Sequence, residues 1–165
     1  MLMMQLIPCV FYFPAIRVFF SPPYWSIVGD IVGKTLVDCT NPLKYSPEEG
    51  LQLAVGFTDS GGEIVQRSAP GVKVVKSFNT YGYENFANPS FPNEANLLPI
   101  MFMAGDDKEA KEQVAALAAS IGFEPFDSGN LRESRNLEPM AMMWIHNSMG
   151  EGARSPHFTW ARLTR

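Results

Sequence analysis

A run of β-branched residues that stops in polar side chains constrains the fold of this chain more than any other feature. Residues 72–77 include three valines, and Phe78, Asn79 and Thr80 follow directly. In an open α/β sheet, ligands bind outside the carboxyl ends of the strands, where such polar side chains meet them. The sequence therefore predicts a buried strand over residues 72–77 and a binding site at its end.

The same pattern occurs earlier in the chain. Residues 35–40 also have the composition of a strand, and Asn41, Pro42 and Leu43 follow them. A short helix predicted over residues 62–68, closed by Pro-Gly, separates the two strands. The order strand, helix, strand predicts a parallel pair with a right-handed crossover, so that both asparagine-containing turns line one crevice.

Hydrophobic periodicity predicts the remaining elements. Residues 107–121 form the clearest helix, because apolar residues recur at helical spacing, an aspartate precedes them and a glycine follows. The last predicted helix, residues 131–149, contains Pro139 and has an apolar second half, which suggests that its methionines belong first of all to the core. The other predicted strands are residues 16–20, 97–104 and 123–126, and residues 44–62 are predicted to form a loop because of their glycines and prolines.

Composition and charge exclude several classes of function. With 165 residues the chain is long enough for one domain with its own core. Its net charge of -4 and the lack of a basic cluster argue against nucleic-acid partners. Two cysteines and two histidines without zinc spacing predict no metal site, and they fit a reduced cytoplasmic protein. Prolines and Arg17 interrupt the apolar stretch 1–20, so we expect neither a membrane span nor a cleaved signal there.

The sequence does not contain the common catalytic and phosphate-binding motifs. Residues 29–35 look like a phosphate-binding loop, but three residues instead of four separate the glycines, and the segment leads into a strand. Neither Gly-x-Gly-x-x-Gly nor Gly-x-Ser-x-Gly occurs. His146 lies on the apolar last helix, where packing is the more common role for a lone histidine. The residues alone therefore assign no acid, base or nucleophile.

Five short motifs follow one another along the chain. They are GKTLVDCTNPL at 33–43, VVKSFNT at 74–80, AGDD at 104–107, GFEPFDSG at 122–129 and LEPMAMMWIH at 137–146. Together they resemble the NADPH-dependent coenzyme F420 reductase family, the F420-dependent NADP oxidoreductases. Each motif alone is weak, but their order and separations are specific, and the resemblance covers about residues 22–163. The cytosolic reductase domain of the STEAP metalloreductases is similar but more distant.

The resemblance implies a Rossmann-like fold that binds NADP, with hydride passing directly between the nicotinamide and the deazaflavin coenzyme F420. The cofactors supply the chemistry and the protein aligns the two rings, so no catalytic residue is assigned. The deazaflavin is expected beside Met140, Met143 and His146, on the helix that closes the cleft. The residues expected to bind cofactor are Pro23, Tyr24, Trp25, Asn41, Pro42, Leu43, Phe78, Asn79 and Thr80.

Residues 1–21 depart from the family, which begins with a strand, a Gly-rich turn and a helix. We therefore expect an atypical apolar segment over residues 1–21 and, over residues 22–165, the second half of an N-terminally truncated Rossmann-like domain with impaired NADP affinity. The alternatives are a reductase of a flavin or ferric acceptor, and a non-catalytic fragment that associates with a full-length relative. The expected partners are small-molecule cofactors, without nucleic acid or membrane, and a homodimer is compatible with the family.

Overall fold

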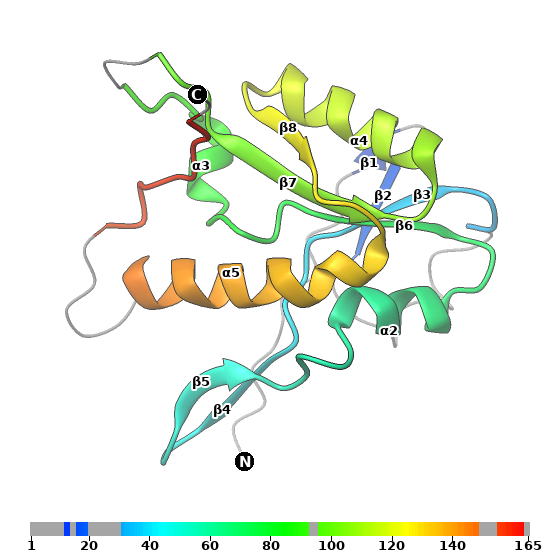
Figure 1. The fold of residues 1–165 in the computed structure, drawn as a ribbon, viewed down its shortest axis with the longest axis horizontal. Helices are drawn as coiled ribbons and strands as arrows, with labels where there is room; N and C mark the ends of the chain where they lie inside the picture. Colours follow the sequence, from blue (N-terminus) through cyan, green and yellow to red (C-terminus); the bar gives the residue numbers. More distant parts are fainter. Residues whose placement is uncertain (1–11, 14–15, 20–30, 93–95, 149–154, 164–165) are drawn as a thin grey trace.

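A six-stranded sheet with helices on both faces forms the body of the protein (Figure 1). The computed structural model describes residues 12–13, 16–19, 31–92, 96–148 and 155–163. The strand order is β1-β2-β3-β6-β7-β8, and β4 and β5 form a separate two-stranded sheet. The strands are β1 Tyr12–Phe13, β2 Ile16–Phe19, β3 Thr35–Asp38, β4 Leu43–Ser46, β5 Gly50–Leu53, β6 Lys73–Ser77, β7 Ile100–Gly105 and β8 Glu124–Asp127. The helices are α2 Gly61–Ser68, α3 Glu84–Ala87, α4 Lys108–Ser120 and α5 Ser134–Ser148, with a 3-10 turn η2 at Leu131–Glu133.

The pairing confirms the predicted α/β fold with a mostly parallel sheet. β3 runs parallel to β2 and to β6, and β7 runs parallel to β8. β1 and β7 are antiparallel to their neighbours β2 and β6. The two strands singled out by the sequence are therefore adjacent, with Leu36 opposite Val74 and Val37 opposite Val75. Within the described residues, no helix is long and apolar enough to span a membrane.

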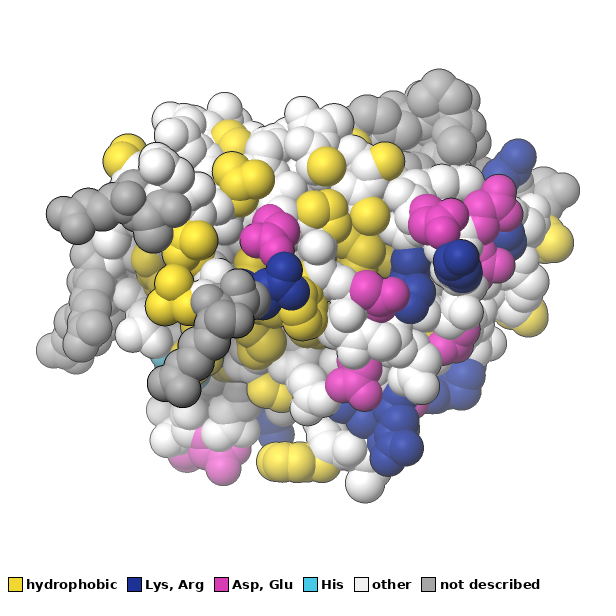
Figure 2. Space-filling model, turned by 45° about the horizontal axis from the view of Figure 1, so that its top comes forward, with side chains coloured by type: hydrophobic (Ala, Val, Ile, Leu, Met, Phe, Trp, Pro, Cys, Tyr) yellow, Lys and Arg dark blue, Asp and Glu magenta, His cyan; other side chains and the backbone are white. Residues whose placement is uncertain are grey.

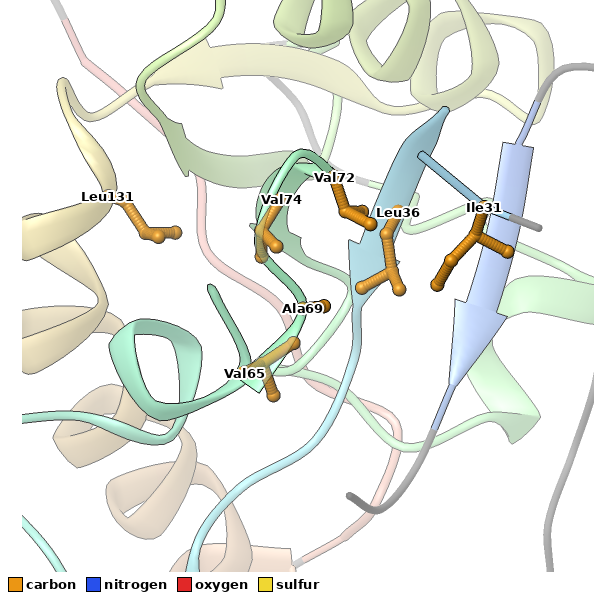
Figure 3. Close-up of a cluster of buried hydrophobic side chains, with 7 residues drawn as sticks. All are labelled: Ile31, Leu36, Val65, Ala69, Val72, Val74 and Leu131. Carbon is orange, nitrogen blue, oxygen red and sulfur yellow. The ribbon is translucent and has the colours of Figure 1, made fainter. Parts of the chain in front are cut away.

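Side chains of β3 and β6 alternate between two hydrophobic clusters, one on each face of the sheet. Val37 and Val75 point to the face covered by α4, where Val114 is completely buried. Leu36 and Val74 point to the opposite face and meet Val65, Ala69, Val72, Ile31 and Leu131 (Figure 3). Because both faces of these strands are covered, each strand has two adjacent apolar residues at its centre, Leu36 and Val37 in β3 and Val74 and Val75 in β6.

The two helices that flank β6 begin at side-chain caps. Asp107 accepts a hydrogen bond from the Ala110 N–H at 2.8 Å and so starts α4, as predicted. Ser60 accepts from the Glu63 N–H at 3.2 Å and starts α2. The Glu63 carboxylate also accepts from the Arg135 guanidinium of α5 at 2.7 and 2.8 Å, so this cap joins α2 to α5.

The Glu63–Arg135 pair predicts a specific pH dependence of stability. Its hydrogen bonds with Arg135 hold the pKa of Glu63 below the ordinary value of 4.5, against the opposing effect of burial. A carboxyl with a depressed folded pKa stabilises the fold above its unfolded pKa, and this contribution is lost as pH falls through the folded pKa. We expect Glu63→Gln to lower the free energy of unfolding at pH 7 by roughly 1–2 kcal/mol. Urea denaturation should show this difference closing below pH 4.5, whereas Glu112→Gln, which removes an exposed carboxylate, should show little difference at any pH.

The prediction of a loop over residues 44–62 was wrong in its first part. Residues 43–53 form an antiparallel hairpin, in which Leu43 pairs with Leu53 and Ser46 pairs with Gly50. Gly50 has a φ of +70°, which glycine adopts without strain, so this residue ends the turn instead of marking a longer loop. The hairpin projects away from the main sheet (Figure 1).

Two further expectations need correction. The strand predicted from residue 97 begins at Ile100, after Pro99, which has no N–H for a ladder. The methionines of α5 are not all in the core, because Met143 is 48% exposed. Helical geometry turns Leu137, Ala141 and Trp144 inward, and Met143 faces the other way.

Candidate functional site

Two asparagine-containing turns meet at the carboxyl edge of β3 and β6. The Asn41 side chain donates from Nδ2 to the backbone oxygen of Asn79 at 3.0 Å. The Asn79 side chain donates in return from Nδ2 to Asn41 Oδ1, also at 3.0 Å. The structure thus brings Asn41 and Asn79 together, and we call residues 38–41 and 77–80 the carboxyl-edge turns.

Asn79 carries an acceptor that nothing in the described structure uses. Its Nδ2 group donates to Asn41 and, at 3.1 Å, to the Leu137 backbone oxygen of α5. Because both partners of Nδ2 are acceptors, the side-chain amide of Asn79 must turn its NH2 group toward them. Its oxygen, Oδ1, is then left without a partner. That oxygen is buried and has no hydrogen-bond partner among the described residues. A buried unpaired acceptor is costly, and at a sheet edge it indicates a ligand that supplies the missing donor.

Phe78 holds an unusual backbone conformation directly before Asn79. Its φ is +60°, a left-handed value that bulky residues rarely adopt. Its ring packs edge to face against Phe86 at a centroid distance of 5.7 Å. Conformations of this kind cost of order 1–3 kcal/mol and are concentrated at ligand sites. This strain is a second feature, besides the unpaired Asn79 oxygen, that indicates a binding function for the turn.

Three charged side chains form a buried ion cluster beneath the carboxyl-edge turns. Lys76 Nζ lies 3.0 Å from Asp38 Oδ2 and 2.8 Å from Glu138 Oε1, and it also donates to the Thr40 backbone oxygen. The three side chains of Lys76, Asp38 and Glu138 are at most 1% exposed. The cluster joins β3, β6 and α5, and we use the name buried ion cluster for these three residues.

The Lys76 ammonium stays charged in this cluster. Burial by itself lowers the pKa of Lys76, but the carboxylates of Asp38 and Glu138 outweigh it, and the net direction is upward. All three hydrogen-bonding positions of the ammonium have acceptors. Lys76 is therefore neither a free base nor a nucleophile in this arrangement.

Glu138 also closes the N-terminus of α2. Its two carboxylate oxygens accept from the backbone N–H groups of Gly61 at 3.0 Å and Gly62 at 3.1 Å. These groups carry the positive end of the helix dipole, which favours an anion. Because Glu138 already fills this position, the α2 N-terminus is not available to a phosphate group.

The close approach of α5 to α2 requires a glycine at position 62. A Cβ atom there would lie 2.6 Å from Ser134 Oγ and 3.1 Å from Ser134 Cβ. We expect Gly62→Ala to lower the free energy of unfolding by roughly 1–3 kcal/mol, through overpacking. Gly56→Ala is the matched control, because a Cβ at residue 56 meets no atom within 4 Å. Urea denaturation of both variants compares them directly, and equal stabilities would contradict this account of the contact.

Cys39 belongs to the carboxyl-edge turn 38–41 and directly follows Asp38 of the buried ion cluster, in surroundings that disfavour its thiolate form. Burial raises the pKa of its thiol far above the ordinary value, and the negative charge of Asp38 acts in the same direction. Lys76 opposes this shift without reversing it. The protonated thiol is a weak nucleophile.

The other predicted site residues fall into three groups. Pro23, Tyr24 and Trp25 lie outside the described residues. Pro42 and Leu43 lead from the first turn into β4, and Thr80 is buried beside Asn79. Met140, Met143 and His146 follow one another on α5, with Met140 half-buried and the other two exposed. These three residues lie on a side of α5 other than the buried side formed by Leu137, Ala141 and Trp144.

The sequence analysis missed Lys76, Asp38 and Glu138 as a connected group. A signal exists for Asp38 and Lys76, since each is a charged residue directly next to apolar residues in a predicted strand. Buried charges occur in proteins almost only when they are paired. A lysine and an aspartate on adjacent parallel strands therefore indicated a buried pair, although not its third member on α5.

A hollow lies at the opposite edge of the sheet. It has a volume of about 310 Å³. Its lining residues are Glu63, Gln66, Arg67, Asp106, Asn130, Leu131 and Arg132. Arg67 already pairs with Asp59 at 2.6 Å, and Asp106 accepts from the Leu131 N–H. Figure 2 shows basic and acidic side chains next to one another on one face of the molecule. Among the described residues that line this hollow, none has an unpaired buried side-chain atom like that of Asn79.

Comparisons with known proteins show that the chain is similar in sequence and fold to a reductase. One similar protein of known structure comes from Arthrobacter sp. FB24 and is described as an inferred F420-dependent NADP reductase. Its sequence is 35% identical, and the two structures superpose with a TM-score of 0.64. The match covers 71% of this chain and 52% of that one. The hypothetical protein SMa0349 from Sinorhizobium meliloti is 30% identical with a TM-score of 0.56, covering 71% and 58%. No protein-family model matches the chain.

Curated relatives are metalloreductases. Rat metalloreductase STEAP3 is 32% identical over 117 residues, which are 71% of this chain and 22% of that protein. Human metalloreductase STEAP2 is 25% identical over 118 residues, or 72% and 21%. The chain thus spans about a fifth of the curated relatives it matches and just over half of the two solved structures. These similarities confirm the predicted Rossmann-like α/β fold, and they show that the chain resembles NADP-linked reductases.

Proposed function

We propose that the chain forms the nicotinamide side of the cofactor site in an NADP-linked oxidoreductase. Hydride would pass between NADPH and coenzyme F420 or a similar acceptor. The observation that carries this proposal is the buried, unpaired Oδ1 of Asn79 at the carboxyl edge of two parallel strands. Ligands of doubly wound sheets bind at such edges.

The donor that Asn79 lacks matches the nicotinamide carboxamide. That group carries an NH2 donor and a carbonyl acceptor, so its NH2 can donate to Asn79 Oδ1. Asn41 and Leu137 hold the Asn79 amide in the required orientation through two hydrogen bonds to Nδ2. A site built in this way prefers a ligand with the matching donor, because a ligand without it leaves the buried acceptor unpaired.

The residues of this chain orient the reactants and do not transfer protons. Bound NADPH itself supplies the hydride, and the protein aligns it with the acceptor. Lys76 is fully paired, and Cys39 is kept protonated by burial, so neither competes with the cofactors for the reaction. The site fits direct hydride transfer, which needs no protein acid or base.

The phosphates of NADP are not expected to bind at the N-terminus of α2. The Gly61 and Gly62 N–H groups already bind the Glu138 carboxylate. Pyrophosphate at this helix would compete with a fixed negative charge for the same two donors. We therefore assign only the nicotinamide half of the cofactor to the carboxyl-edge turns.

Two groups of relatives suggest different hydride acceptors. The Arthrobacter neighbour is described as F420-dependent, which favours a deazaflavin beside Met140, Met143 and His146. The STEAP relatives are metalloreductases, which favours a flavin or ferric acceptor as the second candidate. A further alternative is a chain without activity of its own that associates with a longer relative or with a second copy.

An activity assay separates these candidates. The purified chain is mixed with NADPH and oxidised deazaflavin, and the deazaflavin absorbance is followed. The proposal predicts saturable loss of absorbance, and flavin or ferric chelate in place of deazaflavin tests the second acceptor class. Absence of turnover with every acceptor, together with no NADPH-induced rise in melting temperature, would refute the enzyme proposal for this chain. Co-purification with a longer relative would then support the association alternative.

A further inference from the structure

We propose that the buried ion cluster is a positioning device for the cofactor site. Lys76, Asp38 and Glu138 fix the two carboxyl-edge turns and α5 relative to one another, so that Asn79 presents Oδ1 to the ligand. This inference rests on the proposed function for the identity of the ligand, but its structural part is independent of it. The three residues are positioning residues and do not contact the reacting atoms.

The first part of the device holds the turn after β3. Asp38 Oδ1 accepts from the Thr40 N–H at 2.9 Å and from the Thr40 hydroxyl at 2.7 Å. Lys76 donates to the Thr40 backbone oxygen and to Asp38 Oδ2. Residue 40 is thus held through its amide, its carbonyl and its side chain, directly before Asn41. This fixes the direction in which Asn41 leaves the strand and reaches Asn79.

The second part holds α5 against the same turns. Glu138 accepts from Lys76 on β6 and from two backbone N–H groups of α2. The preceding residue, Leu137, provides the backbone oxygen that receives Asn79 Nδ2 at 3.1 Å. The position of α5 therefore decides where that acceptor lies. A shift of α5 would remove one of the two contacts that orient the Asn79 amide.

The charges of the buried ion cluster are not needed merely to fill this part of the core. Buried ion groups can often be replaced by apolar residues of similar volume without loss of stability. What the apolar replacement lacks is direction, since hydrogen bonds to charged groups are short and oriented. Lys76 uses its three donors on two separate segments, namely the turn after β3, through Asp38 and Thr40, and α5, through Glu138. This distribution is what relates the two turns and α5, and an apolar core would leave them free to shift.

The test uses two variants and one control on the full chain. Glu138→Gln removes one charge at nearly constant volume, and the triple variant Asp38→Asn, Lys76→Met, Glu138→Gln replaces all three charged groups. Glu112→Gln is the control, because Glu112 is an exposed glutamate on α4. Two quantities are measured on each folded protein. They are the NMR resonances of the Asn41 and Asn79 side-chain amides without ligand, and the dissociation constant of NADPH.

In the folded cluster variants, the proposal predicts that the side-chain amide resonances of Asn41 and Asn79 shift and that NADPH binds at least tenfold more weakly. In the control Glu112→Gln, neither quantity should change. Cluster variants that fold with wild-type amide resonances and wild-type NADPH affinity would overturn it. If neither cluster variant folds, the cluster serves the fold and not the site, which also overturns it. If the wild-type chain does not bind NADPH, the proposed function fails, and the amide resonances without ligand still decide the positioning role.

Discussion

Replacing Lys76 by methionine is expected to lower the free energy of unfolding by roughly 3–5 kcal/mol. Methionine has a similar length but no charge, so the carboxylates of Asp38 and Glu138 remain buried without their shared cation. The Thr40 backbone oxygen also loses the Lys76 donor. Leaving charges buried and unpaired is among the most destabilising changes that a single substitution can produce.

Urea denaturation of Lys76→Met at pH 7 checks this expectation. An unchanged m-value would show that the difference lies in stability and not in the extent of unfolding. Lys108→Met is the matched control, because Lys108 pairs with Glu112 at 3.6 Å and the two side chains are 89% and 65% exposed. Exposed pairs of this kind contribute roughly 0–1 kcal/mol. A loss below about 1 kcal/mol in Lys76→Met would contradict the description of the cluster as a buried, fully charged group.

Replacing Asn79 by leucine is expected to weaken NADPH binding by roughly 10- to 100-fold and to destabilise the protein at the same time. Leucine has nearly the same size but can neither accept from the ligand nor donate to its neighbours. Asn41 Oδ1 and the Leu137 backbone oxygen would each lose a donor. Because each unpaired buried acceptor costs roughly 1–3 kcal/mol, we expect the loss of two donors to lower the free energy of unfolding by about 2–6 kcal/mol.

The control for Asn79→Leu is Asn147→Leu on α5. Asn147 is exposed and donates to the Met143 backbone oxygen one turn away, at 2.8 Å. Calorimetric titration with NADPH below the unfolding transition of each variant separates binding from stability. If Asn79→Leu binds NADPH as tightly as the Asn147→Leu control, Asn79 is not part of the nicotinamide site.

The sequence was sufficient to predict the parallel pair of β3 and β6 and its surroundings. Both strands have adjacent apolar residues at their centres, and a polar turn follows each of them. The same residues therefore predicted where the strands lie and which edge of the sheet carries the site. Helix α4 was predicted closely for a similar reason, since Asp107 marks its start and its apolar positions recur at helical spacing. Local patterns of this kind depend little on distant contacts.

The hairpin of residues 43–53 and the buried ion cluster were not predicted, for different physical reasons. In the hairpin, Pro47 and Gly50 are confined to a short turn, while the flanking residues pair across strands that local composition does not reveal. In the cluster, Glu138 meets Lys76 and α2 only after α5 has packed against the sheet. Arg132, Glu133 and Arg135 also carry charge in this part of the chain, so the sequence does not single out Glu138, and its partners are set by the tertiary structure.

The most direct test of the account is an NMR titration of the isotope-labelled chain with NADPH. The account predicts that the side-chain amides of Asn41 and Asn79 shift with saturation, together with the backbone amides of residues 77–80. The residues around the opposite hollow, among them Gln66 and Arg132, should not shift. Shifts confined to that opposite hollow, or no shifts at NADPH concentrations that saturate reductases of this fold, would contradict the assignment of the carboxyl-edge turns as the nicotinamide site.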